Sequence, residues 1–291
     1  MYFFFSSIQS RPSNFDAASA QVYSIHGFVD GANGKKQFPF VIAVMSSRRT
    51  EDYIHLFEGL RRAMEEAGLP CNPTACMMDF EAAAWNAIRH CFPQASLNGC
   101  GFHWAKCVRA KWAKLGLPTA AGNDANLRTI YARVLAHRFF PEQDIPETFK
   151  RIKTSVVGLR YPAEHPVHQF IRYVESQWVS SITFPPKSWS QNGLEIRTNN
   201  DVEGWHRGFN SGQPRPVFYT FMTKVYDSLE DTRMLMQTGQ HRRRNDAAVT
   251  QKNAALQAIL AQLDNMPEGR GISHVLDDIA QLFDYESGAA I

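Results

Sequence analysis

The chain has 291 residues, so it can hold one large domain or two smaller ones, and its 44% hydrophobic content is enough to bury a core. The formal net charge of +3 at pH 7 is only mildly basic; it allows a nucleic-acid partner, and basic segments have to be judged one by one. An odd number of cysteines argues against a secreted disulfide framework, and we therefore expect a reducing, intracellular compartment. The cysteines are Cys71, Cys76, Cys91, Cys100 and Cys107.

The N-terminal stretch from Met1 to Ile8 is apolar and aromatic. It is too short to span a membrane, and it has neither the charged start nor the cleavage site of a signal peptide. It predicts a buried first strand, and we expect that sequence upstream of it has been lost. Two runs rich in β-forming residues follow, Val22 to Val29 and Phe38 to Met45, and the Gly/Asn turn between them predicts a hairpin.

The segment from Thr50 to Glu66 has apolar residues at helical spacing, and we expect Thr50 to cap this helix. A strand from Thr74 to Met78, a helix from Ala82 to His90 and a short strand near Leu97 follow. This β-β-α-β-α-β succession predicts an α/β fold, in which a mixed sheet has helices on its faces.

From about Pro118 the apolar period becomes helical. The predicted apolar stripes are Leu127, Ile130, Tyr131, Val134 and Leu135; Phe170, Ile171, Val174 and Trp178; Phe218, Phe221, Met222, Val225 and Leu229; and Leu256, Ile259, Leu260 and Leu263. We interpret the stripes as packing surfaces, although the last also suits a partner helix. We predict a sheet region, a helical insertion, a pair of closing helices and a helical C-terminal region, over residues 1–117, 118–196, 197–238 and 239–291.

Two acidic residues stand at positions that are typical of a functional site. Asp79 directly follows the predicted strand from Thr74 to Met78, and open α/β sheets place their chemistry at the carboxyl ends of strands. Glu203 lies just after a polar helix start, where Thr198 offers an N-cap and Asp201 follows three residues later. The alternative for this second cluster is a solvated helix cap.

Three neighbours of Glu203 belong to the same candidate site. Glu203, His206 and Arg207 project from one face of the first helical turns. Trp205 either stacks on a base near a cleavage site or serves as a packing anchor. For His206 three roles stay open: it orients Glu203, contacts phosphate or lies on the surface.

A Cys-x-x-His step, Cys100 and His103, opens a predicted helix. It can supply two ligands of a zinc site, with His206 or Cys107 as further donors, but a zinc site needs four. A second interpretation is that His103 contacts DNA or orients another group at a helix start, where the helix dipole favours phosphate. The third is a buried thiol beside a packed histidine. The sequence leaves these three interpretations open.

Two basic segments are candidates for phosphate contacts. The first is the helix that follows the Cys-x-x-His step, and the second is the cluster from His241 to Arg244. The candidate residues of the helix are Lys106, Arg109, Lys111 and Lys114. In each case the alternative is a solvated helix face or helix end.

Several segments occur in a fixed order along the chain. They are Gln21 to Gly27, Phe38 to Val41, Thr74 to Glu81, Phe92 to Ala95, Gly99 to His103, Phe184 to Pro186 and Arg197 to His206. Together they resemble the catalytic domain of Mutator-like element (MULE) transposases, over about residues 11 to 215. The resemblance implies an RNase H-like domain in which a DDE set of carboxylates holds two divalent ions, Mg²⁺ or Mn²⁺, for cleavage and transfer of DNA strands. Asp79 matches the second acid of this set and Glu203 the third.

The position of the first acid differs from the family pattern. The family's first aspartate lies on the opening strand, before the proline that matches Pro12, which puts it near Phe5. No acidic residue stands there, and neither Asp16 nor Asp30 occupies the expected position. We therefore expect a transposase that is truncated at its N-terminus or decayed, with little strand cleavage.

Two other classes of function remain as alternatives. One is a host-adapted module that binds DNA or protein and keeps the fold without the catalysis. The other is a zinc-dependent hydrolase built on Cys100, His103 and His206. For the transposase interpretation the expected partner is double-stranded DNA at transposon ends, in the nucleus, with no membrane and with a homo-oligomer as an open alternative.

Overall fold

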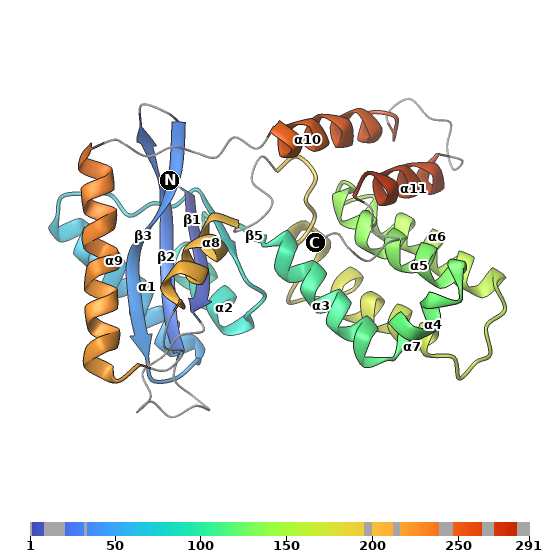
Figure 1. The fold of residues 1–291 in the computed structure, drawn as a ribbon, viewed down its shortest axis with the longest axis horizontal. Coiled ribbons are helices and arrows are strands. Elements are labelled where there is room, and N and C mark those ends of the chain that lie inside the picture. The colour runs from blue at the N-terminus through green and yellow to red at the C-terminus, as the bar shows by residue number, and fades with distance from the viewer. Residues whose placement is uncertain are drawn as a thin grey trace. The chain divides into compact units, whose positions relative to one another are not determined.

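The computed structural model describes residues 2–8, 21–31, 34–194, 200–211, 216–238, 247–263 and 271–283. The chain forms two compact units (Figure 1). We call residues 1–100 and 198–244 the sheet unit, and residues 101–197 and 245–291 the helical unit. The division into four segments that the sequence suggested stays a prediction.

The sheet unit contains one five-stranded mixed sheet. The strands are β1 (Tyr2–Ile8), β2 (Gln21–Gly31), β3 (Gly34–Met45), β4 (Ala75–Met78) and β5 (Ser96–Gly99). Their order in the sheet is β3-β2-β1-β4-β5; β1 is antiparallel to β2 and parallel to β4, and β4 is parallel to β5. The predicted α/β class is confirmed, and the sheet is consistent with the RNase H-like architecture that the resemblance implied.

Helices cover both faces of this sheet. Neighbouring residues of a strand point to opposite faces, so Val22 and Tyr23 of β2 contact different helices. On one face Tyr23 of β2 packs against Tyr53 of α1 (Thr50–Glu66), with ring centroids 5.1 Å apart. On the other face Val22 lies in a cluster with Phe209, at the end of α8 (Asn200–Phe209), and with Phe221 and Val225 of α9 (Phe218–Thr238). The α2 helix (Ala82–Cys91) packs beside α1. The candidate site is built between the sheet and α8.

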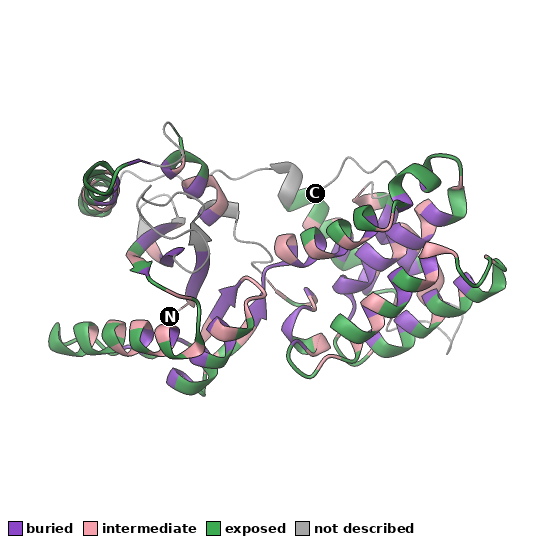
Figure 2. Cartoon of the chain, turned by 90° about the horizontal axis from the view of Figure 1, so that it is seen from below, coloured by how far each residue is buried: buried purple, intermediate pink, exposed green. Residues whose placement is uncertain are grey.

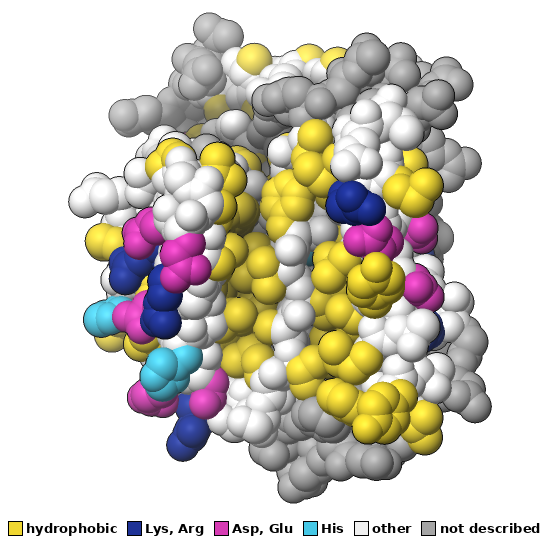
Figure 3. All heavy atoms as spheres, turned by 90° about the vertical axis from the view of Figure 1, so that its left-hand side faces the viewer, with side chains coloured by type: hydrophobic (Ala, Val, Ile, Leu, Met, Phe, Trp, Pro, Cys, Tyr) yellow, Lys and Arg dark blue, Asp and Glu magenta, His cyan; other side chains and the backbone are white. Residues whose placement is uncertain are grey.

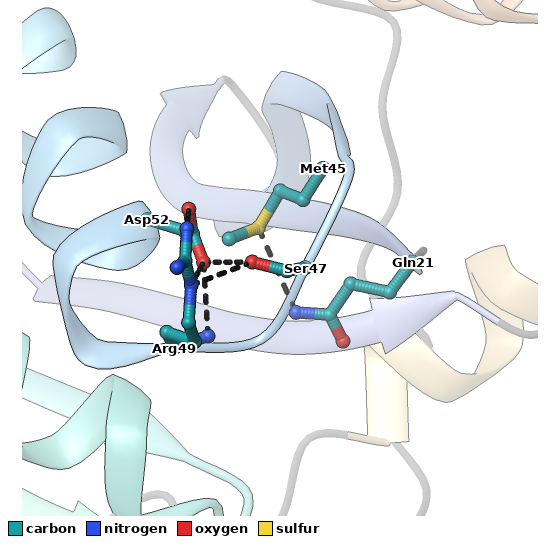
Figure 4. Close-up of polar contacts among 5 residues, drawn as sticks. All are labelled: Gln21, Met45, Ser47, Arg49 and Asp52. Carbon is teal, nitrogen blue, oxygen red and sulfur yellow. Dashed lines mark hydrogen bonds and ion pairs between the residues drawn. The ribbon is translucent and has the colours of Figure 1, made fainter. Parts of the chain in front are cut away.

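The N-terminus of α1 corrects one sequence expectation (Figure 4). Thr50 is the first helical residue, and the N-cap is Arg49. The carboxylate of Asp52 accepts from the Arg49 backbone N–H at 3.0 Å, and the Ser47 hydroxyl also donates to it. The Arg49 guanidinium and then the Ser47 hydroxyl hold the pKa of Asp52 well below its usual value. The acidic residue three positions after the cap therefore closes this helix end.

The edge of the sheet at β3 carries exposed apolar side chains. Figure 3 shows hydrophobic side chains gathered on this face of the sheet unit. Phe40 and Val44 of β3 are 39% and 37% exposed, and Tyr219 and Tyr226 of α9 are 83% and 65% exposed. The predicted α9 stripe is only partly buried: Phe221 and Val225 are buried, whereas Phe218 and Met222 are exposed.

The helical unit is built from short helices around an aromatic core. Its helices are α3 (Gly101–Lys114), α4 (Leu117–Gly122), α5 (Ala125–Ala136), α6 (Ile145–Gly158), α7 (Pro166–Val174), α10 (Ala247–Leu260) and α11 (Ile272–Leu282), with short turns of 3₁₀ or π helix at His137–Phe139, Glu175–Val179 and Pro186–Ser188. The core includes Trp104 and Trp189, whose rings stack with centroids 5.1 Å apart. The stripes predicted for α5 and for the segment from Phe170 to Trp178 are buried, as Figure 2 shows for the interior of this unit. Among the helices that the structure describes, none has both the length and the hydropathy to span a bilayer.

A two-pronged ion pair joins α11 to α5. Nε and Nη2 of Arg133 each donate to one carboxylate oxygen of Asp277, both at 2.7 Å. We expect Asp277→Asn to lower the free energy of unfolding of the helical unit by about 1–2 kcal/mol, because a bidentate, half-buried pair is stronger than an exposed one. Urea unfolding and amide exchange of α11 measure this. The control is Asp278→Asn, which removes one negative charge from the adjacent residue. An equal loss of unfolding free energy in both variants would contradict the role of the ion pair.

Candidate functional site

Asp79 lies at the carboxyl end of β4, where the sequence placed it. Its backbone carbonyl accepts from the Trp85 indole N–H at 2.7 Å and from the Glu81 backbone N–H at 2.9 Å. These bonds fix the turn from β4 into α2. The Asp79 side chain is therefore held at the edge of the turn and is only partly exposed.

Ser6 is the nearest neighbour of Asp79 on the adjoining strand. Because β1 runs parallel to β4 and Phe5 pairs with Met78, the next residue, Ser6, comes level with Asp79. The Ser6 hydroxyl donates to Oδ2 of Asp79 at 3.2 Å, and Ser6 is almost completely buried. Phe5 points to the opposite face and packs against Phe57 of α1, with ring centroids 5.4 Å apart. The position near Phe5, where the family resemblance implies a first acid, stays a prediction; in this structure the residue beside Asp79 is Ser6.

A line of buried polar groups continues from Ser6 across the sheet. Ser24 of β2 pairs with Ser6, and its hydroxyl donates to the Ser6 carbonyl at 3.3 Å. The same hydroxyl oxygen lies 3.1 Å from Nε2 of His206 on α8 and 3.0 Å from Nε2 of His26 on β2. No motif in the sequence pointed to Ser6, Ser24 or His26. The alternation of side chains along β2, which puts Ser24 and His26 on the same face, is a signal that could have paired these two residues.

One hydroxyl group, that of Ser24, links the two histidines. A serine hydroxyl has one hydrogen, and in Ser24 it is directed to the Ser6 carbonyl. The Ser24 oxygen can then accept from Nε2–H of either imidazole, and the direction of each bond depends on the tautomer of the ring. Burial, and after it the nearby His206, lowers the pKa of His26 to about 3, so this ring is neutral at pH 7.

Glu203 lies on α8, one turn before His206, and its side chain is half-buried. His206 bonds to β2 near the middle of the helix, and Phe209 at its end joins the cluster that includes Ile42 of β3. The α8 helix also contacts β1, the strand that carries Ser6. Asp79 and Glu203 thus belong to the same unit, and the strand before Asp79 and the helix of Glu203 both contact β1.

Trp205 is held by three contacts within the sheet unit. Its ring packs edge-on against His26 and stacks on Phe209, with centroids 5.0 Å apart in both cases. Its indole N–H donates to the Ser228 hydroxyl of α9 at 3.1 Å. These are the contacts of a packing anchor, and stacking on a DNA base stays a prediction. The proposed cap by Thr198 and Asp201 lies outside the described side chains.

Comparison with known proteins gives one family. Residues 20–107 match the MULE transposase domain. The match runs from the start of β2 into α3 and includes Asp79, Cys100 and His103. It supports a transposase-like function for the chain. No curated protein matches the chain.

The residues present do not fit the two-ion centre of a complete DDE set. Within the part of the chain that the structure describes, no group of three or more His, Cys, Asp or Glu side chains is arranged to hold a metal ion. The position beside Asp79 carries the neutral Ser6, and the roles of Asp79 and Glu203 as acids of such a set stay predictions. A serine hydroxyl is a poorer ligand than a carboxylate for Mg²⁺ or Mn²⁺.

The Cys-x-x-His step of the MULE match lies at the start of α3. Cys100 is buried, and its backbone N–H donates to the Met78 carbonyl at 2.9 Å. His103 is half-buried, with its ring edge-on to Phe102 at 5.4 Å. The burial of Cys100 accords with a packed thiol, and zinc binding by this pair, like its DNA-contact alternative, stays a prediction.

The α3 helix presents positive charge without compensating acids of its own. Lys106, Arg109 and Lys114 are exposed, and Lys111 is half-buried with its Nζ 5.4 Å from the ring centre of Tyr173. No aspartate or glutamate occurs in the sequence between Glu81 and Asp124. This surface can therefore bind a phosphate backbone, because the sequence around it has no acidic residue that would repel phosphate. Arg207 is exposed on α8, and the cluster from His241 to Arg244 lies outside the described residues.

Proposed function

We propose that this chain is a MULE transposase-like domain that binds double-stranded DNA and in which metal-dependent strand cleavage is impaired. The observation that carries the proposal is the bond between Ser6 and Asp79, since it assigns a neutral residue to the position beside the second acid. The MULE match supports the transposase class, and the strand order supports the fold that this class requires.

The chemistry of phosphodiester cleavage explains why this one position matters. Two divalent ions activate the attacking oxygen and neutralise the leaving oxygen, and carboxylates hold them in place. Asp79 and Glu203 would supply two of the three acids. With Ser6 as the third neighbour the site carries one negative charge fewer, so we expect weak binding of Mg²⁺ or Mn²⁺ and a poorly placed nucleophile.

A plasmid assay tests this proposal. Purified protein is incubated with supercoiled duplex DNA and Mg²⁺ or Mn²⁺, alongside Asp79→Ala and Glu203→Ala. We expect salt-sensitive binding by all three proteins and at most slow nicking by the unmodified chain. Rapid nicking that both substitutions abolish would overturn the impairment. The absence of any binding to duplex DNA would overturn the transposase assignment.

The same geometry favours a second candidate function, a host-adapted module that binds DNA or protein. In this case the fold is kept and the carboxylate set has no catalytic role. Duplex binding by the unmodified chain, with no nicking in either metal and none gained in a variant with a restored carboxylate, would favour this candidate. The nucleus, transposon ends as the DNA target and self-association belong to the first proposal as expectations.

We expect α3 to supply phosphate contacts. The double variant Lys106→Ala/Arg109→Ala should bind duplex DNA about tenfold more weakly at moderate salt, and the slope of log affinity against log salt should fall by about two. Fluorescence anisotropy over a salt series measures both quantities. The control is Lys150→Ala/Lys153→Ala, because these lysines pair with Glu147 and Glu175. A slope that is unchanged in the α3 variant would contradict this surface.

A further inference from the structure

The helix that carries Glu203 is attached to the sheet by two different kinds of contact. At its end, Phe209 packs into an apolar cluster with Val22 and Phe221. Near its middle, Nε2 of His206 lies 3.1 Å from the hydroxyl of Ser24, and both residues are buried. Apolar packing is not directional, whereas a hydrogen bond fixes an orientation. Together with the bond from the Trp205 indole to Ser228, the His206 bond therefore sets the rotation of α8 about its own axis.

Rotation of α8 decides where Glu203 points. Residues three apart in a helix lie on neighbouring positions of one face, so an orientation fixed at His206 is also fixed at Glu203. The bond ends on Ser24, which is in turn bonded to Ser6, and Ser6 is bonded to Asp79. One continuous series of contacts thus runs from the helix of the third acid to the second acid.

We propose that His206, through Ser24, is a positioning residue that holds Glu203 in register with Asp79. The inference rests on the proposed function for the role of the two acids, but the anchoring of α8 itself does not depend on it. The bond requires a side chain at position 206 that can donate to, or accept from, the hydroxyl group at position 24. It does not require an imidazole, so a glutamine amide at position 206 should replace it.

The first experiment needs no metal and no DNA. Hydrogen exchange of the α8 amides is compared in the unmodified chain, His206→Gln, His206→Leu and Ser24→Ala. We expect exchange in residues 202–209 to rise about tenfold in His206→Leu and in Ser24→Ala, relative to α9, and to stay within about twofold in His206→Gln. Ser24→Ala keeps every ring in place, so it tests the bond even where the leucine variant folds poorly. Unchanged exchange of α8 in Ser24→Ala would overturn the inference.

The second experiment separates positioning from simple stabilisation. In a chain that carries Ser6→Asp, Mn²⁺ affinity is measured by calorimetry with and without the His206 substitutions. We expect His206→Leu to weaken Mn²⁺ binding about tenfold, as loss of an orienting neighbour typically does, with a thermal midpoint within a few degrees of the parent, and His206→Gln to restore it. Equal affinity in the leucine and glutamine variants would overturn the positioning role. If no variant binds Mn²⁺ while α8 exchange responds as expected, the anchoring of α8 stands and the role of Asp79 and Glu203 as metal-binding acids fails.

Discussion

Ser6→Asp is expected to create a divalent-ion site. The Ser6 hydroxyl oxygen is 3.2 Å from Oδ2 of Asp79, so a carboxylate at position 6 brings two acids into near contact. Two carboxylates at this distance repel each other, and one of them takes up a proton unless a cation lies between them. The variant should therefore be less stable than the parent in a chelator, and it should regain stability with Mn²⁺ because the ion binds only the folded state.

We expect Mn²⁺ to bind Ser6→Asp at least about tenfold more tightly than it binds the unmodified chain. Calorimetry gives the affinity, and the shift of the thermal midpoint with Mn²⁺ gives an independent measure. Ser6→Asn has nearly the same size without the charge and is the matched control. Adding Asp79→Asn to Ser6→Asp should abolish the gain. Equal Mn²⁺ responses in the aspartate and asparagine variants would show that the two positions do not form a site.

Acid is expected to destabilise both units through buried histidines. Burial is the main reason why the pKa of His26 falls to about 3 and that of His137 to about 4. In an unfolded chain both rings titrate near 6.5, so between these values the unfolded state binds more protons than the folded state. The stability that depends on the neutral rings is complete above about pH 6.5 and is lost as the pH falls toward 3–4. At pH 5 the loss is about 2 kcal/mol for each histidine.

Urea unfolding at pH 8, 6.5 and 5 checks this expectation. His26 lies in the sheet unit and His137 in the helical unit, where its Nδ1 bonds to the Val134 carbonyl at 2.7 Å. His26→Gln should flatten the pH dependence of the sheet unit alone, and His137→Gln that of the helical unit alone. Hydrogen exchange measured by mass spectrometry distinguishes the sheet unit from the helical unit. The exposed His55 is the control position, and an identical pH dependence in all variants would contradict the assignment.

The sequence predicted the parts of the fold that local patterns encode. The order of strands and helices through β5 follows from apolar periods and turn residues, and Asp79 was correctly placed at a strand end. The N-cap of α1 was wrong by one residue: Thr50 is already helical, Arg49 is the cap, and the Asp52 carboxylate accepts from the Arg49 backbone N–H. Such details depend on geometry at a helix end that propensities do not resolve.

The candidate site could be predicted only in part, because its contacts are between distant segments. Ser6 becomes the neighbour of Asp79 only through the parallel pairing of β1 with β4, and no local pattern fixes that register. His206 meets Ser24 only because α8 lies over β2, and no local pattern predicts a contact between residues 182 positions apart. The same holds for the α9 stripe, in which Phe221 and Val225 are buried while Met222 is exposed.

The path of the chain has a consequence for its synthesis. Ser24 and His206 are 182 residues apart, and the whole segment 101–197 separates the two parts of the sheet unit. The first hundred residues therefore emerge from the ribosome before α8 and α9 are synthesised, and until then one face of their sheet stays uncovered. Contacts of such long sequence separation form slowly, which makes the interval before they close the most vulnerable to aggregation. Truncated transcripts that stop before α9 should accordingly yield insoluble product.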